Sequence, residues 1–484
     1  MGKLLNKYKE LPPIMKGTIF FMLITFLNKG FAVISTPIFT RLMTKADYGT
    51  YALYNSWYNI FSVLCTFNIS VGIFNSIVVK EPEKISRISS CVIGFEILIT
   101  TVMGGLYFLV CLFTDGLLGI ANEMGFLIFI ENLFNIPILI WVAIQKFNNN
   151  YIKGFVVMIS EMVIKTALCI LLVVFWDEKV YARILGTVFT YVGFGIVLFV
   201  IIIKDGKAIF DKEIWKILLV VGGPLVFHYL AQNILAQSDQ IMIKYFWGEE
   251  ETANYSLAHS LAWLLGIFNI AINATFIPWM YKKIKRKDYS KISDVCICCL
   301  VVLGGFILII SLLAPEVLLV YGGEEYVSGK ILVPILCCAV MFMFVYKLFT
   351  EIELYYQKTN ITMIATIIAS VVNIALNFVL IPKYKAFGAS IATFISYIIV
   401  CAIHFFAAKR IMRKNGEKLS SVYNTKILLG LTLVLACLIM LVQLLFDFLW
   451  IRIIISVVVL VVTIVIVFRI FKSLGLLKSK KVGL

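Results

Sequence analysis

Several ionisable side chains fall inside stretches of this sequence that are long and apolar enough to cross a bilayer. Lys29 lies near the middle of the apolar run 17–40. Others follow further along the chain: Glu96, Glu131, Glu161, Lys165, Asp239, Lys244 and Lys347. An ionisable side chain at membrane depth is costly, so it persists mainly where it faces a wet cavity or an ion partner. The sequence therefore predicts a protein that carries something polar across a membrane.

The composition is that of an integral membrane protein. Hydrophobic residues make up 61% of the 484 residues, and the mean hydropathy is +0.99. A soluble domain is only about half apolar. Residues 1–16 are polar and basic and lead into the first apolar segment without a small-residue cleavage site, so we expect an anchor there and no cleaved signal peptide.

The spacing of polar residues favours no enzyme chemistry. His228, His259 and His404 share no metal-ligand spacing, and no glycine-rich nucleotide loop or nucleophile elbow is present. We therefore expect no catalytic residues, no metal and no cofactor. Transport energy should come from an ion gradient, with H⁺ or Na⁺ as the candidate coupling ion, or from the membrane potential.

The loops predict the topology. A helix needs about 20 apolar residues to cross the bilayer, and on that measure we predict fourteen transmembrane helices. The basic segments all fall on one side of this count: 1–16, 80–87, 204–216, 281–291, 409–426 and 469–484. The positive-inside rule then places both termini in the cytoplasm. We attribute the net charge of +16 to these loops beside anionic headgroups and expect no nucleic-acid partner.

A weak internal repeat predicts two related halves. Gly49–Leu53 aligns with Ala253–Leu257, and Ala182–Tyr191 aligns with Gly388–Tyr397, in the same order and at nearly the same separation. Parallel repeats with a site between the halves are one way to build a transporter. We thus expect an all-α polytopic membrane protein with two pseudo-symmetric six-helix lobes and two C-terminal helices. Its predicted parts are a cytoplasmic segment 1–16, an N-lobe 17–216, a C-lobe 217–408, a basic cytoplasmic loop 409–426, two helices within 427–470 and a cytoplasmic tail 471–484.

Particular motifs resemble those of a known family. Pro37–Ala52 (PIFTRLMTKADYGTYA) looks like a first outer loop, and Ser238–Phe246 (SDQIMIKYF) looks like the exit of a seventh span. Pro224, Tyr321–Tyr326 and Lys358 also stand where that family tends to have them. On these motifs the whole chain resembles the polysaccharide-transporter branch of the multidrug/oligosaccharidyl-lipid/polysaccharide exporter superfamily, the repeat-unit flippases of capsule, O-antigen and teichoic acid synthesis.

The resemblance implies a function and a location. It implies a flippase of the bacterial plasma membrane that moves an undecaprenyl-diphosphate-linked oligosaccharide from the cytoplasmic to the outer leaflet by alternating access. The implied partners are that lipid-linked glycan, membrane lipids and polysaccharide polymerase or assembly proteins.

The basic residues are candidates for binding an anionic cargo. Lys29 and Lys165 would line a cavity in the N-lobe, because a cation in a low-dielectric cavity attracts a diphosphate more strongly than one in water. Lys165 could instead pair with Glu161 four residues earlier, and Lys29 could belong to a structural ion pair. Arg41 could bind cargo or a lipid headgroup, and Lys244 could bind cargo or hold the lobes together.

The acidic residues are candidates for ion coupling or gating. Glu96, Glu131 and Glu161 could each bind a coupling proton or Na⁺, or could pair with the lysines. Asp239 lies in a motif that matches the family and is expected to serve in gating between the lobes, with cation coupling as the alternative.

Two rival functions remain open from the sequence. A small-molecule exporter of the same superfamily would have an aromatic, acid-rich cavity for cationic drugs, and Lys29 and Lys165 argue against it. A membrane polysaccharide polymerase or ligase would need a long outer loop, and none is long enough.

Overall fold

The computed structural model describes residues 13–473, and within that range it is helical without a β-strand. The chain divides into two compact units, 1–253 and 254–484. The elements of unit 1 are α2 (Pro13–Leu42), α3 (Lys45–Thr66), α4 (Ile69–Gly72), α5 (Phe74–Val78), η1 (Pro82–Lys84), α6 (Ile85–Cys111), α7 (Asn122–Phe147), α8 (Tyr151–Phe175), α9 (Lys179–Gly206), α10 (Lys212–Ile217), η2 (Leu218–Gly222) and α11 (Gly223–Trp247).

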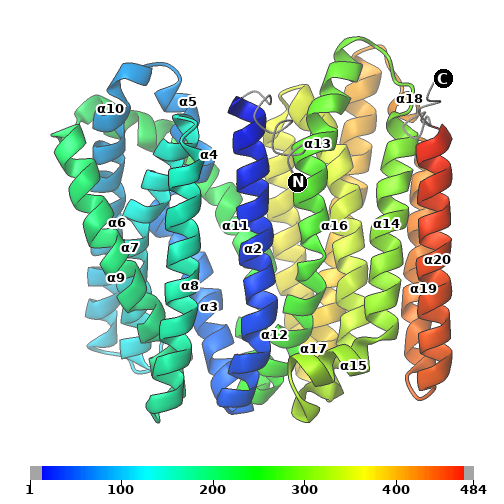
Figure 1. The fold of residues 1–484 in the computed structure, drawn as a ribbon, viewed down its shortest axis with the longest axis horizontal. Coiled ribbons are helices and arrows are strands. Elements are labelled where there is room, and N and C mark those ends of the chain that lie inside the picture. The colour runs from blue at the N-terminus through cyan, green and yellow to red at the C-terminus, as the bar shows by residue number, and fades with distance from the viewer. Residues whose placement is uncertain (1–12, 474–484) are drawn as a thin grey trace, which may run out of the picture. The chain divides into compact units, whose positions relative to one another are not determined.

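The helix α12 (Glu249–Leu264) contains the boundary between the units. The remaining elements of unit 2 are α13 (Gly266–Lys285), α14 (Ile292–Leu312), α15 (Ala314–Tyr321), η3 (Glu324–Ile331), α16 (Leu332–Tyr355), α17 (Thr359–Lys414), α18 (Leu419–Val422), α19 (Thr425–Leu441), η4 (Val442–Leu445) and α20 (Leu449–Ser473) (Figure 1).

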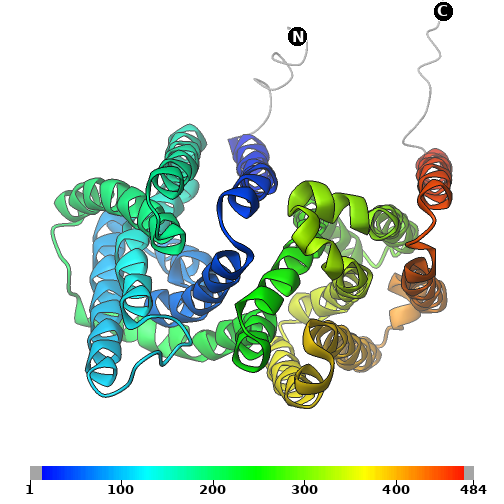
Figure 2. The ribbon, with the colours of Figure 1, turned by 90° about the horizontal axis from the view of Figure 1, so that it is seen from below.

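In unit 1, α9 packs between α7 and α8, α6 packs on α7, and α2 packs on α8 (Figures 1 and 2). Two glycines on α9 permit this close approach. A Cβ at Gly186 would collide with the backbone of Cys169 on α8, and a Cβ at Gly195 would collide with the backbone of Phe134 on α7. Close helix approach through small residues is the usual way in which membrane helices associate.

Local sequence explains where several helices begin and deform. Thr44 caps α3, because its hydroxyl accepts a hydrogen bond from the Asp47 backbone N–H (3.1 Å) while the Asp47 carboxylate accepts one from the Thr44 N–H (3.1 Å). Thr44 and Asp47 thus form the capping box of α3. Further along, Pro224 lacks an N–H, and the π-helical turn η2 ends two residues before it.

In unit 2, α16 is the central helix. It packs on α17, α14 and α19, and 83% of the most apolar 18-residue stretch of Glu324–Tyr355 is buried. The corresponding figure for α20, which packs on α14, is 11%. The bare apolar surface of α20 suits contact with lipid chains.

The structure confirms a helical, multi-pass protein without confirming the predicted count of fourteen. Ten described helices are long and apolar enough to span a membrane. One of them, α17, covers both predicted spans 361–381 and 387–408, which are separated by the non-helical backbone of Lys385 (φ 54°, ψ −141°). The predicted span 50–79 is divided among α3, α4 and α5.

The boundary between the compact units differs from the lobe boundary predicted at 216/217. The helix α11, predicted to open the C-lobe, packs on α3 and so belongs to unit 1. The two-fold relation of the lobes and the cytoplasmic placement of the termini stay predictions.

Candidate functional site

A cluster of polar side chains lies inside unit 1, where four helices meet. We call it the polar cluster, and it consists of Tyr51, Tyr54, Tyr58, Glu131, Asn135, Glu161, Lys165 and Tyr191. The three tyrosines of α3 are three and four residues apart, which places them on one face of that helix. The pairs on α7 and α8 are each four residues apart and share a face in the same way.

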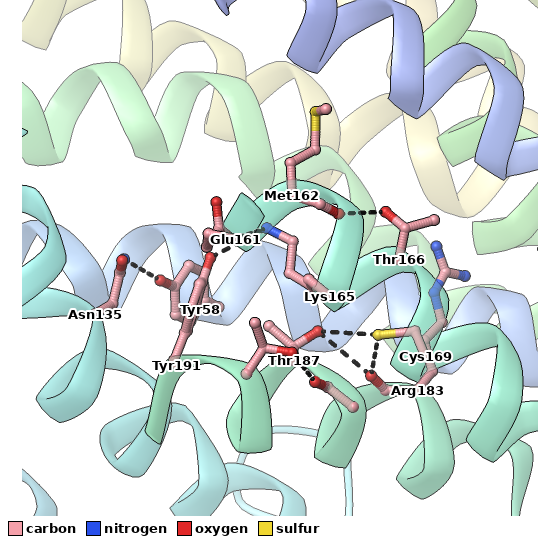
Figure 3. Close-up of polar contacts among 12 residues, drawn as sticks. Tyr58, Asn135, Glu161, Met162, Lys165, Thr166, Cys169, Arg183, Thr187 and Tyr191 are labelled. Atoms are coloured by element: carbon pink, nitrogen blue, oxygen red, sulfur yellow. Dashed lines mark hydrogen bonds and ion pairs between the residues drawn. The ribbon is translucent and has the colours of Figure 1, made fainter. Parts of the chain in front are cut away.

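Tyrosines of α3 bind the polar side chains of α7. The Tyr54 hydroxyl donates a hydrogen bond to Glu131 Oε2 (2.7 Å). Asn135 Nδ2 donates to the Tyr58 hydroxyl (3.0 Å) (Figure 3). Glu131 is only 5% exposed. A carboxylate at such depth is tolerated because a donor satisfies it.

Lys165 is paired within its own helix. Its Nζ donates to Glu161 Oε1 (2.7 Å) and to the Tyr191 hydroxyl (3.4 Å), and it lies 5.2 Å from the centre of the Tyr191 ring (Figure 3). The side chains of Lys165 and Glu161 are 30% and 13% exposed. The helix-internal pair considered from the sequence is therefore formed, and the lysine stays partly open.

The balance of charge in the polar cluster is acidic. Glu131 and Glu161 face one lysine, and Lys165 interacts electrostatically with both. Of the two interpretations of Lys165 left open by the sequence, the pair with Glu161 is present in this conformation. The role of Lys165 in binding cargo stays a prediction.

Arg183 of α9 lies beside the polar cluster and was missed from the sequence. Its guanidinium stacks 3.7 Å from the centre of the Tyr51 ring and 3.9 Å from that of Phe39. Its backbone carbonyl accepts from Cys169 Sγ (3.3 Å) (Figure 3). The only sequence signal was its place inside the repeat Ala182–Tyr191. Stacked rings hold a guanidinium in one plane without neutralising it.

Glu96 of α6 is buried apart from these partners. It is 1% exposed, and within residues 13–473 its Oε1 has no hydrogen-bond partner. The Thr100 hydroxyl donates to the Glu96 backbone carbonyl (2.7 Å) and so does not supply a partner for Oε1. A buried carboxyl in this state is most stable when protonated or bound to a cation.

The remaining candidates are Arg41 and Lys244 near helix ends, Asp239 buried within α11, and Lys29, whose side chain is not described. Arg41 Nη1 donates to the carbonyl of Pro37 (2.8 Å) in the last turn of α2. Lys244 forms an ion pair with Glu249 across the turn between α11 and α12, and this hydrogen bond lowers the pKa of the Glu249 carboxyl. Asp239 is 1% exposed on α11. Lys29 belongs to α2, and its side chain lies outside the described residues.

The described part of the chain offers no metal centre, since no three His, Cys, Asp or Glu side chains lie together in it as metal ligands would. The arrangement in unit 1 can instead bind and release ions. Two carboxylates, one partly exposed lysine and several tyrosine hydroxyls can exchange partners when a proton, a cation or an anion enters.

Apolar helices with a polar cluster in their interior define a multi-pass membrane protein. Residues 14–284 match the family model described as "Polysaccharide biosynthesis protein", and residues 224–379 match the MatE family model. The chain belongs to the polysaccharide biosynthesis family, the polysaccharide-transporter branch of the multidrug/oligosaccharidyl-lipid/polysaccharide exporter superfamily.

Curated relatives are distant. A membrane protein of Methanocaldococcus jannaschii is 22% identical over 81% of this chain and 83% of its own length. A membrane protein of Haemophilus influenzae is 22% identical over 54% of this chain and 65% of its own length. The capsular polysaccharide biosynthesis protein CapF of Staphylococcus aureus is 23% identical over 41% of this chain and 51% of its own length.

Solved structures share the fold. The lipid II flippase MurJ in an inward closed conformation matches with a TM-score of 0.69 at 18% identity, over 94% of this chain and 99% of that one. A superfamily transporter from Pyrococcus furiosus matches with a TM-score of 0.54 at 14% identity, over 82% of this chain and 96% of that one. At identities this low, the comparison shows a shared fold and nothing about substrate or activity.

Proposed function

We propose that the protein is a flippase that moves an undecaprenyl-diphosphate-linked oligosaccharide from the cytoplasmic to the outer leaflet by alternating access, for synthesis of a cell-surface polysaccharide. The observation that carries the proposal is the family match over residues 14–284. The fold shared with the flippase MurJ and the alignment with CapF support it. On this proposal the protein is a transporter of the plasma membrane and catalyses no covalent step.

The polar cluster supplies a mechanism. Lys165 is held by Glu161 in the conformation described here. A proton or Na⁺ that binds Glu161 removes the negative partner of Lys165 and leaves the ammonium group open to the cargo's diphosphate. Cargo binding and ion binding then favour each other, because each weakens the same ion pair.

The buried carboxyls are the coupling sites in this mechanism. Glu131 accepts from Tyr54, Glu161 accepts from Lys165, and Glu96 is buried without a donor on Oε1 among the described residues. A carboxyl that changes partner when it is protonated links an H⁺ gradient to the movement of its helix. Na⁺ is the alternative ion, because carboxylate and carbonyl oxygens also suit it.

A second candidate is a cation-coupled exporter of small molecules. The MatE match over residues 224–379 favours it. The polar cluster favours it too, since two carboxylates and four tyrosines surround one lysine, and such a site suits an organic cation as well as a released lysine suits an anion.

Reconstitution tests the proposal. The full chain is placed in liposomes with a fluorescent undecaprenyl-diphosphate oligosaccharide, and the label in the outer leaflet is quenched at intervals. We expect exchange between leaflets at a rate that rises with an imposed H⁺ or Na⁺ gradient, and protein-free liposomes are the control. Efflux of a cationic dye without exchange of the labelled lipid would overturn the proposal in favour of the exporter.

A further inference from the structure

A groove with a charged end and apolar walls lies between the two limbs of α17 in unit 2. Its volume is about 640 Å³. The limbs run alongside each other, as the hydrogen bond from Asn373 Nδ2 to Thr393 Oγ1 (3.4 Å) indicates. Its lining includes Lys358, Ile361, Ile364, Phe406, Arg410 and Lys414.

The cations of both limbs lie at the same end of the groove, and apolar residues line the rest of it. Along the second limb, Phe406, Arg410 and Lys414 follow one another at spacings of four residues, so they share a face. The first limb starts beside Lys358 and continues with Ile361. A helix rises about 1.5 Å per residue, so Arg410 stands about 6 Å and Lys414 about 12 Å beyond Phe406 along the second limb, and Lys358 stands about 4.5 Å from Ile361 on the first.

A buried pair braces the limbs at this end of the groove. Glu353 of α16 accepts from Thr362 Oγ1 on the first limb (2.8 Å), and its other oxygen lies 2.8 Å from His404 Nδ1 on the second limb. Both Glu353 and His404 are fully buried. The separation of the limbs, and with it the width of the groove, is therefore fixed by the core of unit 2.

The three cations of the groove are uncommitted. Lys358, Arg410 and Lys414 are exposed, and none of them forms an ion pair within the described part of the chain. The lining contains no acidic residue. On the apolar side, Ile364 and Phe406 are 53% and 64% exposed.

We propose that this groove binds an anionic glycerophospholipid of the surrounding membrane. The phosphate would lie among Lys358, Arg410 and Lys414, and the first part of an acyl chain would lie against Ile364 and Phe406. An amphiphile matches the site because its anion and its apolar chain are joined at the spacing that the limbs present. Basic pockets between membrane helices on the cytoplasmic side are typical sites for anionic headgroups.

The inference goes beyond the proposed function and does not depend on it. The groove belongs to unit 2, whereas the polar cluster belongs to unit 1. Lipid binding is measured on purified protein without any transport, so failure of one proposal leaves the other intact.

The test uses the full chain, delipidated in detergent and then supplied with phosphatidylglycerol or phosphatidylcholine, with retained lipid counted by native mass spectrometry. The variant K358Q/R410Q/K414Q removes the cations of the groove. The control K282Q/K285Q/R286Q removes three exposed cations of unit 2 elsewhere. We expect the first variant to retain phosphatidylglycerol about tenfold more weakly than the wild type, and the control to stay within about twofold.

A second arm tests the apolar wall. The variant I364A/F406A should weaken retention of phosphatidylglycerol while all three cations remain. Equal retention by the wild type and K358Q/R410Q/K414Q would overturn the proposal. So would full displacement of phosphatidylglycerol by millimolar glycerol 3-phosphate, which would indicate a site for soluble anions. Binding of undecaprenyl diphosphate with no binding of phosphatidylglycerol would also overturn it and assign the groove to the cargo.

Discussion

The two units bury similar ionisable groups in different ways. In unit 1, Lys165 and Glu161 pair within one helix and stay 30% and 13% exposed. In unit 2, the His404 and Glu353 side chains are only 1% and 0% exposed, and they join two helices. A pair that is partly open within one helix can exchange partners at little structural cost. A pair sealed between helices holds those helices together.

The surroundings of the two pairs widen this difference. Lys165 adjoins tyrosine hydroxyls and a second carboxylate, Glu131. Each of these groups could accept a hydrogen bond from the Lys165 ammonium in place of Glu161. His404 stacks on Tyr346 (5.4 Å between ring centres), and Glu353 uses its second oxygen for Thr362. On the proposed function, ions would exchange in unit 1, while the buried pair of unit 2 holds α16 and α17 together.

The largest expected effect is on stability, from His404→Ala. The change leaves Glu353 buried with one oxygen unpartnered, and breaking a buried pair in this way costs about 3–5 kcal/mol. We expect a several-fold lower level of protein in the membrane and a lower unfolding temperature in detergent. His228→Ala is the matched control, because that ring is half-buried beside Gln232. Normal abundance of the His404 variant would remove the contrast between the units.

The next effect is on transport, from Lys165→Ala. Loss of the cation removes attraction for the anionic head, so we expect export of the lipid-linked glycan to fall about tenfold or more while the protein level stays near normal. Lys153→Ala, an exposed position on the same helix, is the control. Lys29→Ala is expected to behave as Lys165→Ala does. If the amount of the Lys165→Ala protein in the membrane fell together with export, the Lys165–Glu161 pair would be structural, as the His404–Glu353 pair is.

A smaller effect is expected from Tyr54→Phe. The change removes the donor to Glu131 and leaves that buried carboxylate less satisfied, at a cost of about 1–3 kcal/mol. Thermal unfolding in detergent measures it, with Tyr58→Phe as the comparison, since Tyr58 binds the neutral Asn135. An equal loss in both variants would show that the charge of Glu131 is irrelevant to the packing of α3 on α7.

The smallest effect lies outside both clusters, at Asp211, which caps α10. It accepts from the backbone N–H groups of Ile214 (3.3 Å) and Glu213 (3.1 Å) and from Arg87 Nη2 (2.7 Å). The hydrogen bond from Ile214, together with Arg87, lowers the pKa of the Asp211 carboxyl. Asp211→Ala should cost about 1 kcal/mol at neutral pH.

The pH dependence of this effect has a definite sign. Because the pKa of Asp211 is lower in the folded protein, its contribution is fully present above the ordinary aspartate pKa of about 3.9 and is lost as the pH falls through the lowered value. The difference in unfolding temperature between wild type and Asp211→Ala should therefore shrink on acidification below about pH 4. If the difference in unfolding temperature grew below about pH 4 instead, the charged Asp211 carboxylate would not be stabilising the start of α10.

Interactions within one helix could be predicted from the sequence, and interactions between distant segments could not. The spacing of Glu161 and Lys165 predicts their pair, and apolar length predicts the helices. Tyr54 and Glu131 are 77 residues apart, so nothing local joins them. Arg452 at the start of α20 is likewise 3% exposed and bound by both Nη atoms to Glu316 (2.6 and 2.7 Å), a partner far away in the sequence.

On the proposed mechanism, Glu161 restrains Lys165 until an ion releases it for an anionic cargo. The affinity of purified wild type, Glu161→Gln and Lys165→Gln for a short-chain polyprenyl diphosphate measures this restraint. Glu161→Gln frees the ammonium group and should bind more tightly than the wild type, whereas Lys165→Gln should bind more weakly. Affinities that fall in both variants, or change in neither, would contradict the proposed mechanism.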